Sequence, residues 1–249
     1  MAKEISQPAK KLKLDIVQKS SPLRPNAFVA IPFDDSNIKF KIKQVQDIIT
    51  QKEPKLSKAC VPVDKSHLTL LVFYTENIEK VIEALTPVLD NYEFPLPEIK
   101  VKSLGHFRHH VLYAELEENS INPLKILWQK IRDILVENNV EGIDLRDDFK
   151  SHITIMKLSR MKYKTVRKID PNLHQDLKDF EFGIQSVKEI QVLSMTKPIQ
   201  PNGYYHCEHS FPVKIPTQKN LIRNNSTILI LTAATALLAF AYIAKKWRR

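Results

Sequence analysis

One short string of chemically useful residues occurs twice in the sequence. Residues 65–70 read Lys-Ser-His-Leu-Thr-Leu, and residues 150–155 read Lys-Ser-His-Ile-Thr-Ile. Because side chains alternate between the two faces of a β-strand, a His-x-Thr pair in a strand presents an imidazole and a hydroxyl on the same face. Each copy supplies one such pair, His67 with Thr69 and His152 with Thr154.

Two such pairs suit the cleavage of a phosphodiester. The reaction needs a base that removes a proton from the attacking hydroxyl and an acid that protonates the leaving oxygen. Two histidines fill both roles near neutral pH, because the ordinary pKa of an imidazole is about 6.5. The threonine hydroxyls can donate hydrogen bonds to the non-bridging oxygens, where charge gathers in the transition state. We therefore predict a phosphodiesterase that uses no metal and no cofactor, with the catalytic residues His67, Thr69, His152 and Thr154.

Alternating helices and strands are expected to position these pairs. Apolar residues at helical spacing predict helices over 38–51, 78–89 and 124–136. Short apolar or alternating runs predict strands over 27–31, 68–73, 111–116, 153–158 and 190–195. The motif thus falls at a strand in each of two similar halves, which indicates an α+β domain with two sheets.

The net charge of +10 is concentrated at the two ends of the chain. Residues 1–24 carry six Lys and Arg against two acids and show no sustained apolar period, so we expect them to be disordered. Residues 214–249 carry seven Lys and Arg and no acid, which leaves −1 for residues 25–213. A nearly neutral centre argues against a long nucleic-acid duplex as partner, since duplex binding needs many phosphate contacts.

Residues 227–244 form an apolar run without a charge, followed by a basic tail over 245–249. At a rise of about 1.5 Å per residue the run reaches about 27 Å, close to the roughly 30 Å of a bilayer hydrocarbon core. We predict a linker over 214–226 and a transmembrane helix over 227–244, with the lipid bilayer as a partner. Two cysteines and no N-terminal signal peptide favour a reducing compartment. We therefore expect a single-pass, tail-anchored protein whose large domain faces the cytosol, in the mitochondrial outer membrane or the endoplasmic reticulum.

The paired motifs resemble the signature of the 2H phosphoesterases, which include LigT-like RNA ligases and cyclic phosphodiesterases. More specifically, residues 25–213 are similar to the central nucleotide-binding domain of the small A-kinase anchoring proteins. The supporting stretches are Pro25–Phe28, Ser66–Val72, Phe149–Ser159, Lys168–Pro171 and, most specifically, Asn202–Glu208. The resemblance implies a bilobal fold with pseudo-twofold symmetry, in which two antiparallel sheets surround a central cleft and the two motifs face each other.

The resemblance also implies binding of AMP-like nucleotides, and some family members cleave 2′,5′-linked oligoadenylate or RNA 3′ ends. By motif, His67 and His152 would be the acid/base pair, without saying which is the base, and Thr69 and Thr154 would hold the phosphate. In the anchoring proteins a helix that binds a kinase regulatory subunit follows this domain. Here a short linker and the apolar run take its place, so the kinase regulatory subunit is a weaker expectation as partner.

Four further residues are candidates for substrate binding. Lys65 and Lys150 stand two residues before the histidines and can hold phosphate, with solvation at the surface as the alternative. Phe107 lies in residues 105–110, which we interpret as a turn before a strand, and the matching family stretch borders the cleft. Tyr204 is a candidate for contact with a base, with structural packing as the favoured alternative.

Two functions remain open from the sequence. The first is a phosphodiesterase acting on a 2′,5′- or 2′,3′-cyclic phosphodiester in a nucleotide or short RNA. The second is an AMP-type nucleotide sensor displayed at a membrane, with little turnover. Four intact His and Thr positions favour the enzyme, because a pure binder can lose an imidazole at little cost.

Overall fold

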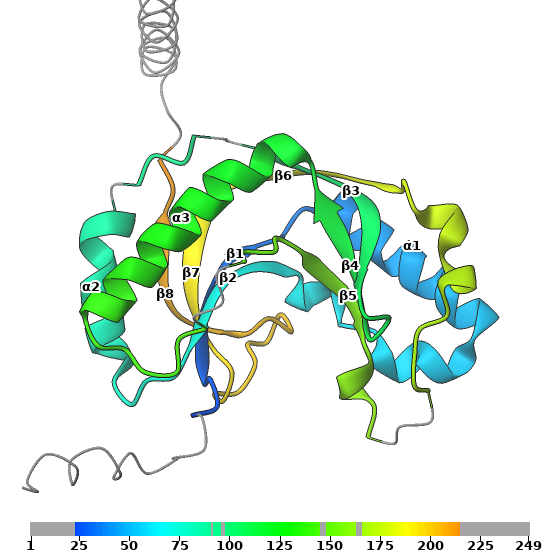
Figure 1. Cartoon of the computed structure of the whole chain (residues 1–249), viewed down its shortest axis with the longest axis horizontal. Helices are drawn as coiled ribbons and strands as arrows, with labels where there is room; N and C mark the ends of the chain where they lie inside the picture. The colour runs from blue at the N-terminus through cyan, green and yellow to red at the C-terminus, as the bar shows by residue number, and fades with distance from the viewer. Residues whose placement is uncertain (1–22, 91, 96–97, 145–147, 163–165, 215–249) are drawn as a thin grey trace, which may run out of the picture.

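The computed structural model describes residues 23–90, 92–95, 98–144, 148–162 and 166–214. Within these ranges eight strands form one antiparallel sheet in the order β6-β3-β4-β5-β2-β1-β7-β8 (Figure 1). Their bounds are β1 Ala27–Pro32, β2 His67–Phe73, β3 Glu98–Phe107, β4 Val111–Leu116, β5 Ile153–Lys157, β6 Glu181–Ser186, β7 Glu189–Ser194 and β8 His206–Pro212. The five strands predicted from the sequence are confirmed as β1, β2, β4, β5 and β7, whereas β3, β6 and β8 were not predicted.

Three α-helices pack on this sheet, and all three were predicted. They are α1 (Ser36–Lys52), α2 (Ile78–Leu89) and α3 (Glu118–Glu137). The side chains of Asp35 and Asn77 cap the first two, each accepting a hydrogen bond from a backbone N–H in the first turn. Short 3₁₀ helices occur at Pro54–Ala59, Val63–Lys65, Leu158–Arg160, Pro171–Leu173 and Gln175–Leu177.

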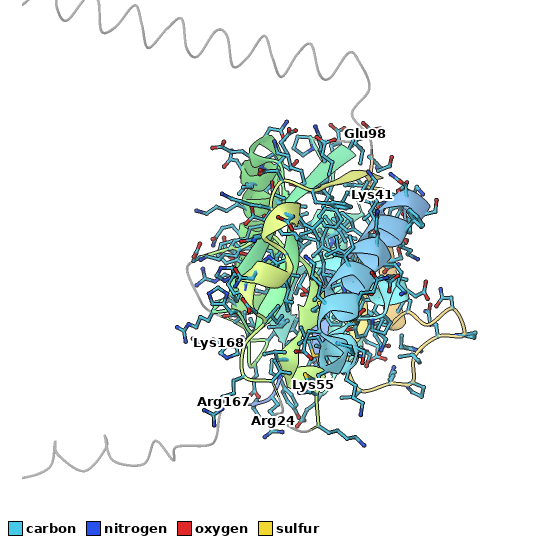
Figure 2. The ribbon with its side chains drawn as sticks, turned by 90° about the vertical axis from the view of Figure 1, so that its right-hand side faces the viewer. Arg24, Lys41, Lys55, Glu98, Arg167 and Lys168 are labelled. Carbon is cyan, nitrogen blue, oxygen red and sulfur yellow. The ribbon has the colours of Figure 1, made fainter. Side chains whose placement is uncertain are left out.

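The helices cover the two halves of the sheet separately. Helix α1 contacts β5 and β6, while α3 contacts β2 and α2 contacts β8. In Figure 1, α1 accordingly lies on the side of β3 and β4, and α2 and α3 lie on the side of β7 and β8. Figure 2 looks at the molecule from the side of α1, with Lys41 near the start of this helix and Lys55 just beyond its end.

The prediction of two sheets is wrong, because the two motif strands join the halves into one. Strands β2 and β5 pair antiparallel through Leu68 and Ile153. The order is nevertheless symmetric about this junction, with β1, β7 and β8 following β2 outward, and β4, β3 and β6 following β5. A hydrophobic pattern indicates where a strand lies but not which neighbour its edge pairs with, so the sequence could not reveal this junction.

Each motif strand contains a β-bulge at the same position. In the β1–β2 register Thr69 and then Leu71 have partners, which leaves Leu70 as the extra residue. In the β4–β5 register Ile155 is skipped in the same way, directly after Thr154. Bulges bend a strand and re-aim side chains, and they are frequent beside active sites. The pseudo-twofold relation of the halves therefore extends to this local irregularity.

The hydrophobic core fixes the direction in which the motif side chains point. Leu68 and Ile153 are fully buried in the same cluster as Ile42 of α1 and Leu127 of α3. Because side chains alternate along a strand, the histidines and threonines next to these two residues face the opposite side of the sheet.

No helix within the described ranges is long and apolar enough to cross a bilayer. The predicted transmembrane helix over 227–244 and the basic tail lie outside the described residues, as do nearly all of the linker and of the N-terminal segment.

Candidate active site

The register of the central strands brings the two motifs together. Leu68 lies opposite Ile153. Continuing this antiparallel register by one residue on either side places the first histidine opposite the second threonine, and the first threonine opposite the second histidine. Side chains directly opposite each other in an antiparallel pair have Cβ atoms about 4.5–5.5 Å apart. All four side chains of the motifs therefore meet on one face, at the centre of the sheet.

The same hydrogen bond holds both imidazoles. Nδ1 of His67 lies 2.7 Å from the carbonyl oxygen of Lys65, and Nδ1 of His152 lies 2.7 Å from that of Lys150. A carbonyl oxygen only accepts hydrogen bonds, so Nδ1 is the donor in each case. In the neutral ring, Nε2 then carries the lone pair. The lysine backbone thus selects the tautomer that leaves Nε2 as the hydrogen-bond acceptor.

Aromatic rings pack against the imidazole of His67. The ring centroid of Phe28 in β1 lies 5.1 Å away, and that of Tyr205 lies 5.4 Å away with the planes nearly perpendicular. The ammonium nitrogen of Lys65 lies 4.9 Å from the centroid of the Tyr205 ring, within the range of a cation–π contact. Tyr205 is therefore in contact with both His67 and Lys65.

Two rings pack in a similar way against His152. The centroid of Phe107 lies 4.9 Å from that of the imidazole, and the centroid of Tyr113 lies 5.4 Å from it. Phe107 and Tyr113 also contact each other, with centroids 4.4 Å apart. Tyr113 reaches the site because it pairs with Thr154 across β4 and β5. Each histidine is thus held between a backbone carbonyl and two aromatic rings.

The electrostatic surroundings favour a neutral His67. Burial is the main cause and lowers the pKa of this imidazole to about 4, although the hydrogen bond with the backbone of Lys65 acts in the opposite direction. The positive charges of His152 and Lys157 lower the pKa further. At neutral pH His67 therefore carries a lone pair on Nε2 and is able to accept a proton.

A cavity of about 520 Å³ adjoins the motif residues Thr69, His152 and Thr154. This volume lies within the range of about 300–1,000 Å³ that is typical of small-molecule sites. Its wall combines aromatic rings with charged groups, namely Phe107, Trp128, Phe149, Asp144, Asp148, Lys150 and Lys157. The site can therefore receive a flat, apolar ring with polar edges beside the two motifs.

The four sequence candidates for substrate binding lie in different surroundings. Phe107 lies at the end of β3 rather than in a turn, because the turn begins at Arg108, and it contacts His152. Lys65 ends a 3₁₀ helix and Lys150 precedes β5, so neither lies on a strand. Lys150 lines the cavity, 3.6 Å from Asp148. Tyr204 packs in a small apolar cluster with Phe28 and Leu193, and its hydroxyl is buried with no hydrogen-bond partner in the described part of the chain.

Several residues of the site were not among the sequence candidates. Tyr205, rather than its neighbour Tyr204, contacts the first histidine. The local sequence after Gly203 gave no signal that distinguishes which of the two tyrosines faces the histidine. Phe28 and Tyr113 lie in predicted strands, but only the pairing of those strands brings them to the histidines.

His152, which was a sequence candidate, lies one residue before β5 begins.

Within the described residues, no group of three or more His, Cys, Asp and Glu side chains is arranged to hold a metal ion. The chemistry that the arrangement can supply comes from two imidazoles and two hydroxyls around one point. This set fits an acid, a base and two hydrogen-bond donors for a phosphate group.

Two His-x-Thr motifs that meet at the centre of one antiparallel sheet, beside a nucleotide-sized cavity, are the arrangement of the two-histidine (2H) phosphoesterases. The chain belongs to the family described as the AKAP7 2′5′ RNA ligase-like domain, whose model matches residues 25–213.

Known proteins are similar to this chain in sequence and in fold. A-kinase anchor protein 7 isoform gamma of Homo sapiens is 32% identical over 223 residues, which cover 84% of this chain and 64% of that protein. The chain therefore spans somewhat less than two thirds of that relative. The protein TT0787 of Thermus thermophilus has a TM-score of 0.55 at 19% identity and covers 77% of this chain and 100% of its own. LigT of E. coli in complex with 3′-AMP has a TM-score of 0.52 at 17% identity, covering 76% and 98%.

Proposed function

We propose that the protein is a phosphodiesterase that cleaves a 2′,5′- or 2′,3′-cyclic phosphodiester in a nucleotide or short RNA. The observation that carries this proposal is the register of β2 and β5, which places each histidine opposite the threonine of the other motif. A single phosphate between the strands then has an imidazole and a hydroxyl on either side.

The two histidines take different roles in this proposal. His67 is neutral at pH 7 and takes the proton of the attacking hydroxyl or water on Nε2. As the new P–O bond forms, His152 gives a proton to the oxygen that leaves. Thr69 and Thr154 donate hydrogen bonds to the non-bridging oxygens as negative charge develops on them. An anionic phosphate also raises the pKa of His67 on binding, which brings this base closer to the working pH.

The relatives support the type of substrate. The family name refers to 2′5′ RNA ligase-like domains, and LigT of E. coli was solved with 3′-AMP bound. The cavity next to the motifs contains three aromatic rings and two carboxylates. The rings can stack on a nucleobase, and the carboxylates can accept hydrogen bonds from its amino group.

A turnover assay with the full-length protein tests the proposal. Wild type and a His67→Ala/His152→Ala double variant are incubated in excess EDTA with 2′,5′-linked diadenosine monophosphate and with 2′,3′-cyclic AMP. Turnover that the double substitution abolishes supports the enzyme, provided that both proteins melt at similar temperatures. Tight binding of AMP without turnover of either diester would contradict the proposal and support the nucleotide sensor.

We also propose that residues 227–244 anchor the protein in a membrane, on the basis of their apolar sequence. A fluorescent fusion truncated after Asn225 is expected to become soluble, and an unchanged distribution would contradict the proposal. Co-staining of the untruncated fusion with markers distinguishes mitochondria from the endoplasmic reticulum. The kinase regulatory subunit, suggested by the name of the human relative, can be tested by co-precipitation with the same fusion.

A further inference from the structure

A buried glutamine of helix α1 is hydrogen-bonded to the second motif strand. Gln46 is a polar residue within the core, with 4% of its surface exposed. Its amide nitrogen Nε2 donates to the carbonyl oxygen of Ile155 at 3.0 Å and to that of Val61 at 2.7 Å. A side-chain amide has two N–H donors, so Gln46 uses both of them on the main chain.

The carbonyl group of Ile155 needs these donors because of the β-bulge. Ile155 is the residue that the β4–β5 register skips, and β2 pairs with β5 only through Leu68 and Ile153. Neither neighbouring strand therefore pairs with Ile155, which is fully buried. A buried backbone carbonyl without a donor is strongly unfavourable. Gln46 and the backbone N–H of Val61, which donates to the same oxygen at 3.0 Å, stabilise the bulge in place of a strand.

The chain next to Val61 is fixed at the same place. Cys60 pairs with Met156 in an isolated antiparallel bridge, and Gln46 links the carbonyl group of Val61 to α1. This short segment thus pairs with β5 along the edge where β2 no longer does. In the other half of the sheet the corresponding bulge residue, Leu70, lines the cavity instead. Gln46 therefore supports the bulge of the second motif strand.

This bulge determines where the second motif directs its side chains. It follows directly after Thr154, which lies opposite Tyr113, and the ring of Tyr113 contacts His152. Because side chains alternate along a strand, loss of the extra residue would reverse the faces of the residues on one side of the bulge. Even a partial shift would displace the hydroxyl of Thr154 and the aromatic ring that packs on His152.

We propose that Gln46 is a positioning residue of the active site, which fixes the bulge of β5 and through it the placement of Thr154 and His152 around the phosphate. It acts from α1, which packs in the core, whereas the motif side chains face the opposite side of the sheet. Such supporting hydrogen bonds keep catalytic groups in a productive geometry. This inference rests on the proposed phosphodiesterase activity, because it assigns a role in that reaction.

The Gln46→Met variant tests this role, because methionine has a side chain of similar length without either donor. Gln185→Met is the matched control. Gln185 lies in the edge strand β6 and is also buried, with 2% of its surface exposed. Its amide donates to Asp34 and to the carbonyl oxygen of Ser186, and it accepts a hydrogen bond from the backbone N–H of Asp35. The two substitutions thus remove comparable buried networks, and only one of these networks adjoins a motif.

Turnover of 2′,5′-linked diadenosine monophosphate is measured at a temperature at which the wild type and both variants are folded. Both substitutions are expected to lower the melting temperature, since each leaves polar groups of the main chain without a partner. Gln46→Met is expected to lower kcat by about tenfold or more with a smaller change in KM, as for a displaced catalytic group. Gln185→Met is expected to keep the wild-type kcat. The inference is overturned if Gln46→Met keeps the wild-type kcat, or if Gln185→Met lowers kcat as much.

A second substitution at the same position covers the case in which Gln46→Met does not fold. In Gln46→Glu the protonated carboxyl group keeps one donor, and ionisation replaces it with a charge against two carbonyl oxygens. The ratio of its kcat to that of the wild type is therefore expected to fall as the pH rises. A ratio near one at every pH would overturn the inference.

NMR spectra of the histidine rings separate a failure of this inference from a failure of the proposed function. Long-range ¹H–¹⁵N spectra report the two imidazoles without turnover, and His67→Asn and His152→Asn assign them. Gln46→Met is expected to shift the resonances of His152 more than those of His67, and Gln185→Met to shift neither. If the wild type turns over no diester but this pattern is observed, Gln46 positions the imidazole without the catalysis. Unchanged resonances of His152 in Gln46→Met, or equal changes in both rings, reject the inference even if turnover is observed.

Discussion

Nδ1 of His67 and Nδ1 of His152 are each fixed by the carbonyl oxygen of the lysine two residues earlier, at 2.7 Å in both cases. The repeated sequence Lys-Ser-His thus encodes the orientation of the imidazole ring as well as its identity. Carbonyl and ring belong to residues only two positions apart, so the bond forms within the motif and needs no distant partner. Such second contacts hold a reactive side chain in its productive tautomer.

Replacement of either histidine by asparagine tests this division of roles between the two ring nitrogens. The amide nitrogen of asparagine can take the place of Nδ1 and donate to the lysine carbonyl, but no group takes the place of Nε2. We expect His67→Asn and His152→Asn each to lower kcat by roughly 10²–10⁴-fold, the usual contribution of an acid or base. The measurement is turnover of 2′,5′-linked diadenosine monophosphate.

Melting temperatures of both asparagine variants serve as the control and are expected to stay near that of the wild type. A variant that melts normally and retains most of its turnover would show that the substituted imidazole transfers no proton in the rate-limiting step.

The motif and the strands that carry it were predictable because they depend on local sequence. The strands missed are mostly edges of the sheet: β6 and β8 end the strand order, and in β8 only Phe211 is fully buried. An edge strand has little apolar pattern, since much of its surface meets solvent. Strand β3 was missed although Ile99 and Val101 alternate in it.

The aromatic surroundings of the histidines could not be predicted for a different reason. Tyr113 and Phe28 become neighbours of the site only through the pairing of β4 with β5 and of β1 with β2. Register is set by the packing of the whole sheet and by the bulges in it, neither of which has a signature in the sequence of a single strand.

The low pKa of His67 predicts a dependence of stability on pH. The folded-state pKa of about 4 lies below the ordinary value of 6.5, so between these values the unfolded chain binds more protons than the folded chain. The free energy of unfolding is therefore expected to decrease as the pH falls from about 6.5 to about 4. Denaturant titrations at a series of pH values measure this slope.

The His67→Asn variant is the comparison for the pH series. Its slope in the same window is expected to be shallower than that of the wild type, because the substitution removes one group with a lowered pKa. The slope will not vanish, since burial also lowers the pKa of His174. Identical slopes in the two proteins would mean that His67 titrates near its ordinary pKa in the fold.

The threonines are expected to act mainly on the transition state. Thr69→Val and Thr154→Val keep the shape and the β-branched character of the side chain but remove the hydroxyl donor. Each is expected to lower kcat by about 10²-fold or more with a smaller change in KM, as for other donors to developing oxyanions. Thr→Ser at either position restores the donor and should recover most of the rate. A loss in the serine variants with little loss in the valine variants would indicate a packing role for the methyl group instead.

Gly105 is predicted to control the position of the second histidine without touching it. This residue lies opposite Tyr113 in the β3–β4 pair, and a Cβ built on it would lie 2.4 Å from Cε2 and 2.6 Å from Cζ of that ring. Gly105→Ala must therefore displace the ring of Tyr113, which contacts both Phe107 and His152. A small misplacement of a catalytic group is costly, so we expect kcat to fall by about tenfold or more while the protein still folds.

A double-variant comparison shows whether this loss passes through the tyrosine. Tyr113→Ala removes the atoms that the new methyl group would strike. The kcat of this single variant is the reference for the double variant. If the ring is the cause, adding Gly105→Ala to Tyr113→Ala will cost much less in kcat than adding it to the wild type, because the effects of residues in contact are not additive. Full additivity of the two losses would locate the effect of the alanine elsewhere, for example at Glu115, whose carboxylate also lies 2.4 Å from the added atom.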